Sequence, residues 1–218
     1  MFRVLLYDQW KAVRQPLALV SIISFALPVL SVQNAAPHPV FGVRAHELLV
    51  TQAIWGTAYP LLAGALGLLL GVMAWTRDHR TDHVYALSLP LPRWKYALLK
   101  FGAGGVLVVP AVMTLGVGTG IAALAATVPE GLASYPVALT ARFGLTSMMA
   151  FSIFFAISSG TSRTAGVVLG SLAVLVGGGV FLDVIGLGEH VIDPLFDLLF
   201  RPGSPFDSFG GRWMLIDV

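Results

Sequence analysis

The sequence predicts an all-α integral membrane protein, a single transmembrane domain over residues 1–218 built as a bundle of five membrane-spanning helices. Two observations lead to this prediction. Of the 218 residues, 56% are hydrophobic and 11% are charged, whereas a water-soluble domain carries about 25% charged residues. The mean hydropathy is +0.83, and the apolar residues gather in runs of the length, about 20 residues, that a helix needs to cross the bilayer. A soluble enzyme, a disordered linker and a nucleic-acid partner are therefore excluded.

Five apolar runs have the length of a membrane span. We expect the spans at residues 16–32, 54–75, 101–128, 141–159 and 164–185. Pro16 suits the first turn of a helix, where its missing N–H is not needed, and Pro110 gives the long third span a place to bend. Three consecutive glycines from Gly177 favour a bend or a break in the fifth span.

Residues 1–15 are expected to form an amphipathic helix on the membrane surface. Its apolar stripe consists of Phe2, Leu6, Trp10 and Val13. Phosphate headgroups are within reach of its cations, Arg3, Lys11 and Arg14. A loosely ordered leader is the alternative, and a cleavable signal peptide is not expected because the segment lacks a basic tip followed by an apolar run.

The distribution of cations predicts the orientation in the membrane. With alternating spans, the N-terminus and the connections after the second and fourth spans share one side. That side holds Arg3, Lys11, Arg14, Arg77, Arg80, Arg93, Lys95, Lys100 and Arg163. The other side holds only Arg44, Arg142, Arg201 and Arg212. The positive-inside rule then places the N-terminus in the cytoplasm, so we expect a multi-pass protein of the plasma (inner) membrane, in contact with its lipids.

Three small-residue patterns indicate where helices pack together. They are Gly67-x-x-x-Gly71, Gly116-x-x-x-Gly120 and Gly166-x-x-x-Gly170. Each pattern puts two glycines on one helix face, and such faces let backbones approach closely where lipid tails supply no hydrophobic drive. Because these patterns are common in polytopic proteins, they predict a packed bundle and no particular function.

Residues 76–100, between the second and third predicted spans, carry most of the functional information. The segment begins with a charged helical turn, continues as a short amphipathic helix that ends at the Pro-Leu-Pro from Pro90, and re-enters the membrane through basic residues. Tyr85, Leu87 and Leu89 are too apolar for a simple solvated loop. They need a surface to bury against, either the bilayer or a cytoplasmic partner.

This segment carries an extended motif. An acidic-basic cluster after the second span is followed by Tyr-Ala-Leu-Ser-Leu-Pro-Leu-Pro-Arg, which ends at Arg93, and then by Lys100. The motif resembles that of the type-2 permease family of ABC exporters, with its Glu-Arg pair, its Leu-Leu-Ser-Leu-Pro-hydrophobic-Ser-Arg stretch and its downstream Lys. In that family the segment is the cytoplasmic coupling helix, which docks on the ATP-hydrolysing subunit. The resemblance therefore assigns ATPase coupling to Asp78, Arg80, Tyr85, Leu87, Ser88, Leu89, Pro90 and Arg93.

The chain departs from the family in several places. Asp78 stands where the family usually has Glu, His83 lies where Gly or Thr is more usual, and Pro92 replaces a small polar residue. The family has six spans, with an external re-entrant hairpin before the sixth. Here we expect residues 186–218 to form an extracytoplasmic re-entrant or tail segment, with the sixth span missing or supplied by a partner.

Two smaller groups of residues have both a functional and a simpler interpretation. His79 and His83 share a helix face and could hold a metal ion, but no third or fourth ligand is evident, so we interpret them as part of a charged turn and expect no metal. Arg142 is either a cation that reaches to the membrane interface or a functional cation inside the bundle. Asp183 could pair with it.

The resemblance implies a permease subunit of an ABC exporter. Such a subunit forms the translocation path with a second permease subunit, identical or homologous, and couples to a separate ABC ATPase subunit. The sequence contains no P-loop and no catalytic motif, so we expect neither enzyme activity nor a cofactor in this chain, with ATP hydrolysis in the partner. The alternative is a non-transporting membrane subunit that scaffolds or anchors a larger complex.

Overall fold

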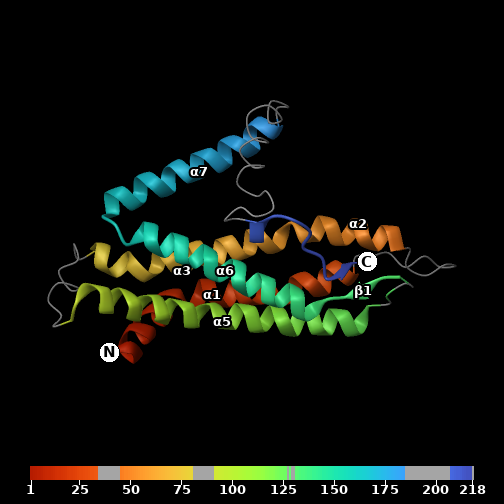
Figure 1. Ribbon diagram of the computed structural model, residues 1–218, viewed down its shortest axis with the longest axis horizontal. Coiled ribbons are helices and arrows are strands. Elements are labelled where there is room, and N and C mark those ends of the chain that lie inside the picture. Colours follow the sequence, from red (N-terminus) through yellow and green to blue (C-terminus); the bar gives the residue numbers. More distant parts are fainter. Residues whose placement is uncertain (34–44, 81–90, 127, 129–130, 185–206, 218) are drawn as a thin grey trace.

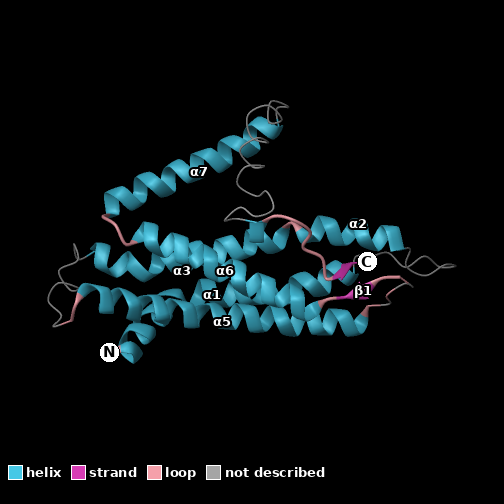
Figure 2. Cartoon of the chain, viewed as in Figure 1, coloured by secondary structure: helices cyan, strands magenta, loops and turns pink. Residues whose placement is uncertain are grey.

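The computed structural model describes residues 1–33, 45–80, 91–126, 128, 131–184 and 207–217. Nearly all of this part of the chain is helical (Figure 2). The helices are α1 (Phe2–Gln33), α2 (Ala45–Gly56), α3 (Ala58–Arg80), α5 (Arg93–Ala125), α6 (Pro136–Ser158) and α7 (Ser162–Val184). The remaining elements are β1 (Ala133–Ser134), the short 3-10 helix η1 (Asp207–Phe209) and β2 (Ile216–Asp217).

Four helical stretches in the described chain are long and apolar enough to cross a membrane. They are Phe2–Gln33, Leu48–Arg80, Arg93–Ala125 and Pro136–Ser158. A shorter apolar stretch, Arg163–Gly179, lies in α7. Large apolar side chains cover the outside of the bundle, and Leu61 and Leu124 are 74% and 91% exposed in the isolated chain. The sequence-based expectation of an all-α protein with the apolar helices of a membrane protein is confirmed.

The two helices expected over residues 1–15 and 16–32 are one helix, α1, which contains Pro16. The helix continues past the proline because Leu5, Gln9, Val13 and Leu17, spaced four apart, are all buried and form one face along both halves. Its first turns point away from the axis of the rest of the helix (Figure 1). The expected apolar stripe is divided, since Val13 faces the core whereas Phe2 and Trp10 are exposed.

The second and third spans also differ from their expected boundaries. The run 54–75 is interrupted at Thr57, and α2, which extends it toward the N-terminus, is not predicted by the sequence analysis. The third span is expected from residue 101, but α5 begins at Arg93, directly after Pro92. Proline favours this position because its fixed φ suits a helix start and its missing N–H is not needed there. Residues 76–80 and 93–100 of the expected coupling segment are therefore parts of α3 and α5.

The core lies where α1, α3, α5 and α6 meet, with α1 packed most extensively on α5 and α3 on α6. The contact between α3 and α6 depends on two glycines, as the sequence predicts. A Cβ added at Gly67 would lie 2.4 Å from the Ala150 Cβ, and one at Gly71 would lie 2.8 Å from the Phe154 Cβ. A Cβ added at Gly116 would lie 3.2 Å from the Thr140 Cγ2 atom. The other three glycines expected at helix contacts have no neighbour within 4 Å in the described chain, namely Gly120, Gly166 and Gly170.

Helix α7 leaves the bundle at an angle (Figure 1) and contacts it mainly near its start, beside the end of α6. The three glycines at 177–179 do not break it, because α7 is continuous over Ser162–Val184. Glycine costs a helix about 1 kcal/mol per residue relative to alanine, which weakens the helix without ending it. Most of the described side chains of α7 are exposed in the isolated chain.

The C-terminal segment 207–217 returns to the end of the bundle opposite the start of α1 (Figure 1). There β2 pairs antiparallel with β1, with Ala133 opposite Asp217 and Ser134 opposite Ile216. Trp213 also passes close to the turn between α2 and α3, where a Cβ on Gly56 would lie 2.4 Å from the Trp213 carbonyl oxygen. Of the expected external segment, residues 186–206 and 218 lie outside the described part, and the rest is docked on the bundle.

Candidate functional site

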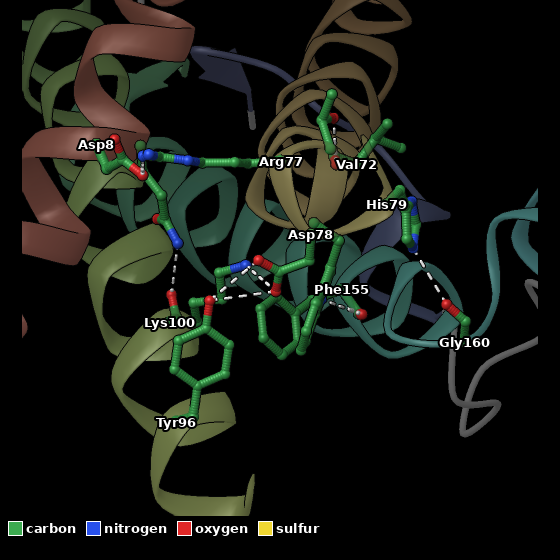
Figure 3. Close-up of polar contacts among 12 residues, drawn as sticks. Asp8, Val72, Arg77, Asp78, His79, Tyr96, Lys100, Phe155 and Gly160 are labelled. Atoms are coloured by element: carbon green, nitrogen blue, oxygen red, sulfur yellow. Dashed lines mark hydrogen bonds and ion pairs between the residues drawn. The ribbon is translucent and has the colours of Figure 1, made fainter. Parts of the chain in front are cut away.

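Three polar side chains are buried together where α3 ends and α5 begins. Asp78, Lys100 and Tyr96 are 1%, 4% and 5% exposed. Lys100 Nζ donates a hydrogen bond to Asp78 Oδ2 at 2.7 Å. The Tyr96 hydroxyl lies 3.1 and 3.2 Å from the two oxygens of the same carboxylate (Figure 3). The cluster joins the last turn of one helix to the first turns of the other.

The local sequence accounts for this arrangement. Tyr96 and Lys100 are four residues apart on α5, and Trp75 and Asp78 are three apart on α3, so each pair shares a helix face. Lys100 Nζ lies 4.5 Å from the centroid of the Trp75 ring and 5.1 Å from that of Tyr96, distances at which a cation is attracted to an aromatic face. A buried lysine is tolerated here because a carboxylate and two rings surround it.

The other two core helices are tied to the same cluster. On α1, Gln9 Nε2 donates to the Lys100 carbonyl oxygen at 3.2 Å. On α6, the Phe155 carbonyl oxygen accepts a hydrogen bond from Trp75 Nε1 at 3.1 Å. Arg77 also pairs with Asp8 of α1 (Figure 3), but the side chains are 61% and 36% exposed, and an ion pair in such a position contributes little stability.

The structure describes three of the eight residues assigned to ATPase coupling. Arg80 and Arg93 are exposed, at the end of α3 and the start of α5. Asp78 is buried, and its carboxylate is paired with Lys100 of the same chain. The other five lie outside the described residues, namely Tyr85, Leu87, Ser88, Leu89 and Pro90.

The residues that complete the cluster were not singled out from the sequence. Lys100 enters the sequence analysis as one of the cations that predict the orientation and as the downstream Lys of the resemblance, and Tyr96 and Trp75 have no role there. One feature of the sequence could have indicated the cluster. Tyr96 and Lys100 are four residues apart at the start of one helix, and Asp78 lies at the end of the helix before it.

The described residues contain no group of three or more His, Asp or Glu side chains placed to hold a metal ion. A ring nitrogen of His79 lies 3.1 Å from the Gly160 carbonyl oxygen, at the turn between α6 and α7. His83, the second member of the pair weighed as a metal site, lies outside the described residues. His79 therefore links α3 to the α6–α7 turn.

Arg142 lies at the opposite end of the bundle, where its side chain contacts the C-terminal segment. Its guanidinium donates hydrogen bonds to the carbonyl oxygens of Gly210 and of Arg212, the latter at 2.6 Å. It also lies 4.4 Å from the centroid of the Trp213 ring, which in turn stacks on Tyr59. Arg142 therefore fastens the C-terminal segment to α6. The side chain of Asp183, considered as its partner, lies outside the described residues.

Replacing Arg142 with Ala is expected to release the C-terminal segment. Hydrogen bonds from a charged donor contribute about 1.5–3 kcal/mol each, so docking should weaken by at least about tenfold. The chain contains no cysteine, so a Leu215→Cys substitution, at a position that is 0% exposed, gives a single reporter whose labelling rate measures release. Arg212→Ala is the matched control, because the Arg212 side chain is 79% exposed and its ion pair with Asp217 is long, at 3.8 Å. Equal labelling rates in the two variants would contradict the fastening role.

The chemistry of the buried cluster follows from its own geometry. Comparisons of the chain with family models, curated proteins and solved structures find no match. The Asp78 carboxylate accepts hydrogen bonds from both Lys100 and Tyr96, an arrangement that holds two helix ends together. The cluster therefore holds the end of α3 and the start of α5 together. These two helices flank the connection that carries the motif.

Proposed function

We propose that this chain is the permease subunit of an ABC exporter and that residues 76–100 couple it to a separate ATPase subunit. One observation supports the proposal above all. The connection that carries the motif joins two helices whose ends are held together by the buried pair of Asp78 and Lys100. A force on the connection reaches both helices at once, because separating them would leave a buried charge unpaired, which costs several kcal/mol.

In the proposed mechanism, ATP is hydrolysed by the partner, since this sequence contains no P-loop. Closure of two ATPase subunits pushes on the connection, and α3 and α5 move as one body. Helices α1 and α6 follow through Gln9 and through the bond from Trp75 to Phe155. Rigid-body motion of this kind converts binding energy in the partner into a tilt of the spans, which opens a path shared with a second permease subunit.

The proposal includes a topology in the inner membrane. The start of α1, the end of α3, the start of α5 and the α6–α7 turn lie at the same end of the bundle (Figure 1). The sequence segments at that end carry nine of the 13 Lys and Arg residues, so we assign it to the cytoplasm. Helix α7 then serves as the fifth span and the first turns of α1 as the interfacial helix.

The double substitution Leu87→Asp/Leu89→Asp is expected to abolish association with the ATPase. Burying one leucine contributes about 1.5–3 kcal/mol, so losing two should weaken docking by more than about tenfold. The measurement is the ATP hydrolysis that copurifies with tagged chain from native membranes in mild detergent. Mass spectrometry then shows whether the copurified subunit has a P-loop.

The matched control is Thr161→Asp, which adds a carboxylate at an exposed position in the α6–α7 turn at the same end of the bundle. Its hydroxyl contacts the Thr164 amide, a contact that aspartate can also make, so ATPase copurification should be unchanged. Equal copurification with the double variant and the wild type would overturn the docking assignment. If the wild type copurifies with other membrane proteins and without any ATPase, the scaffolding function is correct instead.

A further inference from the structure

A cavity of about 520 Å³ lies beside the buried cluster, between α1, α3 and α5. Part of its wall is positively charged. Lys11 of α1 and both Arg77 and Arg80 of α3 line it and are exposed. Two carboxylates also line it, but one is paired with Lys100 and the other, Asp8, with Arg77. The wall therefore has a net positive charge, contributed by Lys11 and Arg80.

The rest of the wall is mainly apolar, with Gln9, Thr76 and Tyr96 as its polar residues. On α3, Met73 and Ala74 line the cavity and lie nearer the middle of the helix than Arg77 and Arg80. They precede these cations by one to two helical turns, so the α3 wall of the cavity changes from apolar to cationic toward the end of the helix. The change occurs at the end of the bundle where the apolar helices give way to charged residues, which is the level of lipid headgroups for a membrane-spanning helix.

We propose that this cavity binds one anionic phospholipid, with the phosphate against Lys11 and Arg80 and the upper part of an acyl chain against Met73 and Ala74. Charge complementarity selects an anionic headgroup, because basic residues near a membrane surface attract acidic lipids. The apolar wall selects a lipid over a free phosphate, which would leave that wall in contact with water. The bound lipid would brace the first turns of α1 against the end of α3. The proposal is independent of any ATPase.

The test is lipid retention by the purified chain. The chain is delipidated in neutral detergent and titrated with dioleoylphosphatidylglycerol or dioleoylphosphatidylcholine, and bound lipid is counted by native mass spectrometry. We expect the wild type to retain one phosphatidylglycerol in preference to phosphatidylcholine. The double variant Lys11→Gln/Arg80→Gln should bind phosphatidylglycerol about tenfold more weakly, since each cation contributes to the attraction. Arg163→Gln, which removes an exposed cation at the same end of the bundle but away from the cavity, should have no effect.

A variant with the opposite expected sign separates binding from folding. Asp8→Asn removes a carboxylate from the cavity wall, so phosphatidylglycerol should bind several-fold more tightly, as expected when an unfavourable like charge is removed. A damaged fold cannot produce tighter binding. Three results would overturn the proposal: equal affinity for the two lipids, unchanged binding in the double variant, or displacement of the lipid by millimolar inorganic phosphate, which would indicate a site for a soluble anion.

Discussion

The substitution Lys100→Met is expected to lower the free energy of unfolding by about 3–5 kcal/mol, the cost of breaking a buried ion pair from one side. The Asp78 carboxylate, 1% exposed, would stay buried without the ammonium group that lies 2.7 Å away. Methionine keeps most of the volume of the lysine side chain. The decrease in the free energy of unfolding therefore comes mainly from the missing charge and not from a cavity. Denaturant unfolding in mixed micelles, followed by tryptophan fluorescence, measures the change.

A double-mutant cycle tests whether the two charges act as a pair. Removing both, in Asp78→Asn/Lys100→Met, should restore most of the lost stability, because no uncompensated charge then remains buried. Lys95→Met is the matched control, since Lys95 is exposed on the same helix and surface substitutions usually change stability by less than about 0.5 kcal/mol. Two results would contradict the role of the buried pair in holding α3 to α5. One is that Lys100→Met lowers the free energy of unfolding no more than Lys95→Met does, and the other is that the loss in the double variant equals the sum of the losses in the two single variants.

The apolar spans could be predicted because each depends only on its own composition. The apolar run of the third span begins at residue 101, but the helix that contains it begins earlier. Helix α5 starts directly after Pro92 and includes the charged residues Lys95 and Lys100. Helix α2 is not predicted because its 12 residues are too few to cross a membrane, and His46, Glu47 and Gln52 interrupt its apolar residues. Only the turn residue Thr57 separates α2 from α3.

Contacts between distant residues could not be predicted from the sequence. The docking of Trp213 requires a glycine at position 56 and an arginine at position 142, and no local pattern connects the three. For the same reason the pairing of Asp78 with Lys100 is not predicted by the sequence. The resemblance indicates that the position carries a charge, but only the relative placement of α3 and α5 shows that Lys100 of the same chain neutralises it.

Gly67→Ala is expected to destabilise the protein by about 1–3 kcal/mol, the usual cost of forcing extra volume into a packed core. The new methyl group would lie 2.4 Å from the Ala150 Cβ and 2.5 Å from the Phe151 backbone nitrogen. These atoms belong to the backbone and first side-chain atom of α6, which cannot rotate away, so the two helices would have to separate. Gly71→Ala should act in the same direction, because its Cβ would lie 2.8 Å from the Phe155 backbone nitrogen. The same unfolding measurement applies.

The control has the opposite expected sign. Gly120 lies inside α5, and no atom of the described residues is within 4 Å of an added Cβ, so Gly120→Ala should be neutral or stabilise the helix by up to about 1 kcal/mol. Both substitutions give the same gain in intrinsic helix propensity, and the difference between them isolates the contact with α6. If Gly67→Ala proved as stable as Gly120→Ala, α3 and α6 would not pack backbone to backbone, and the pattern at 67 and 71 would have no role in holding the bundle together.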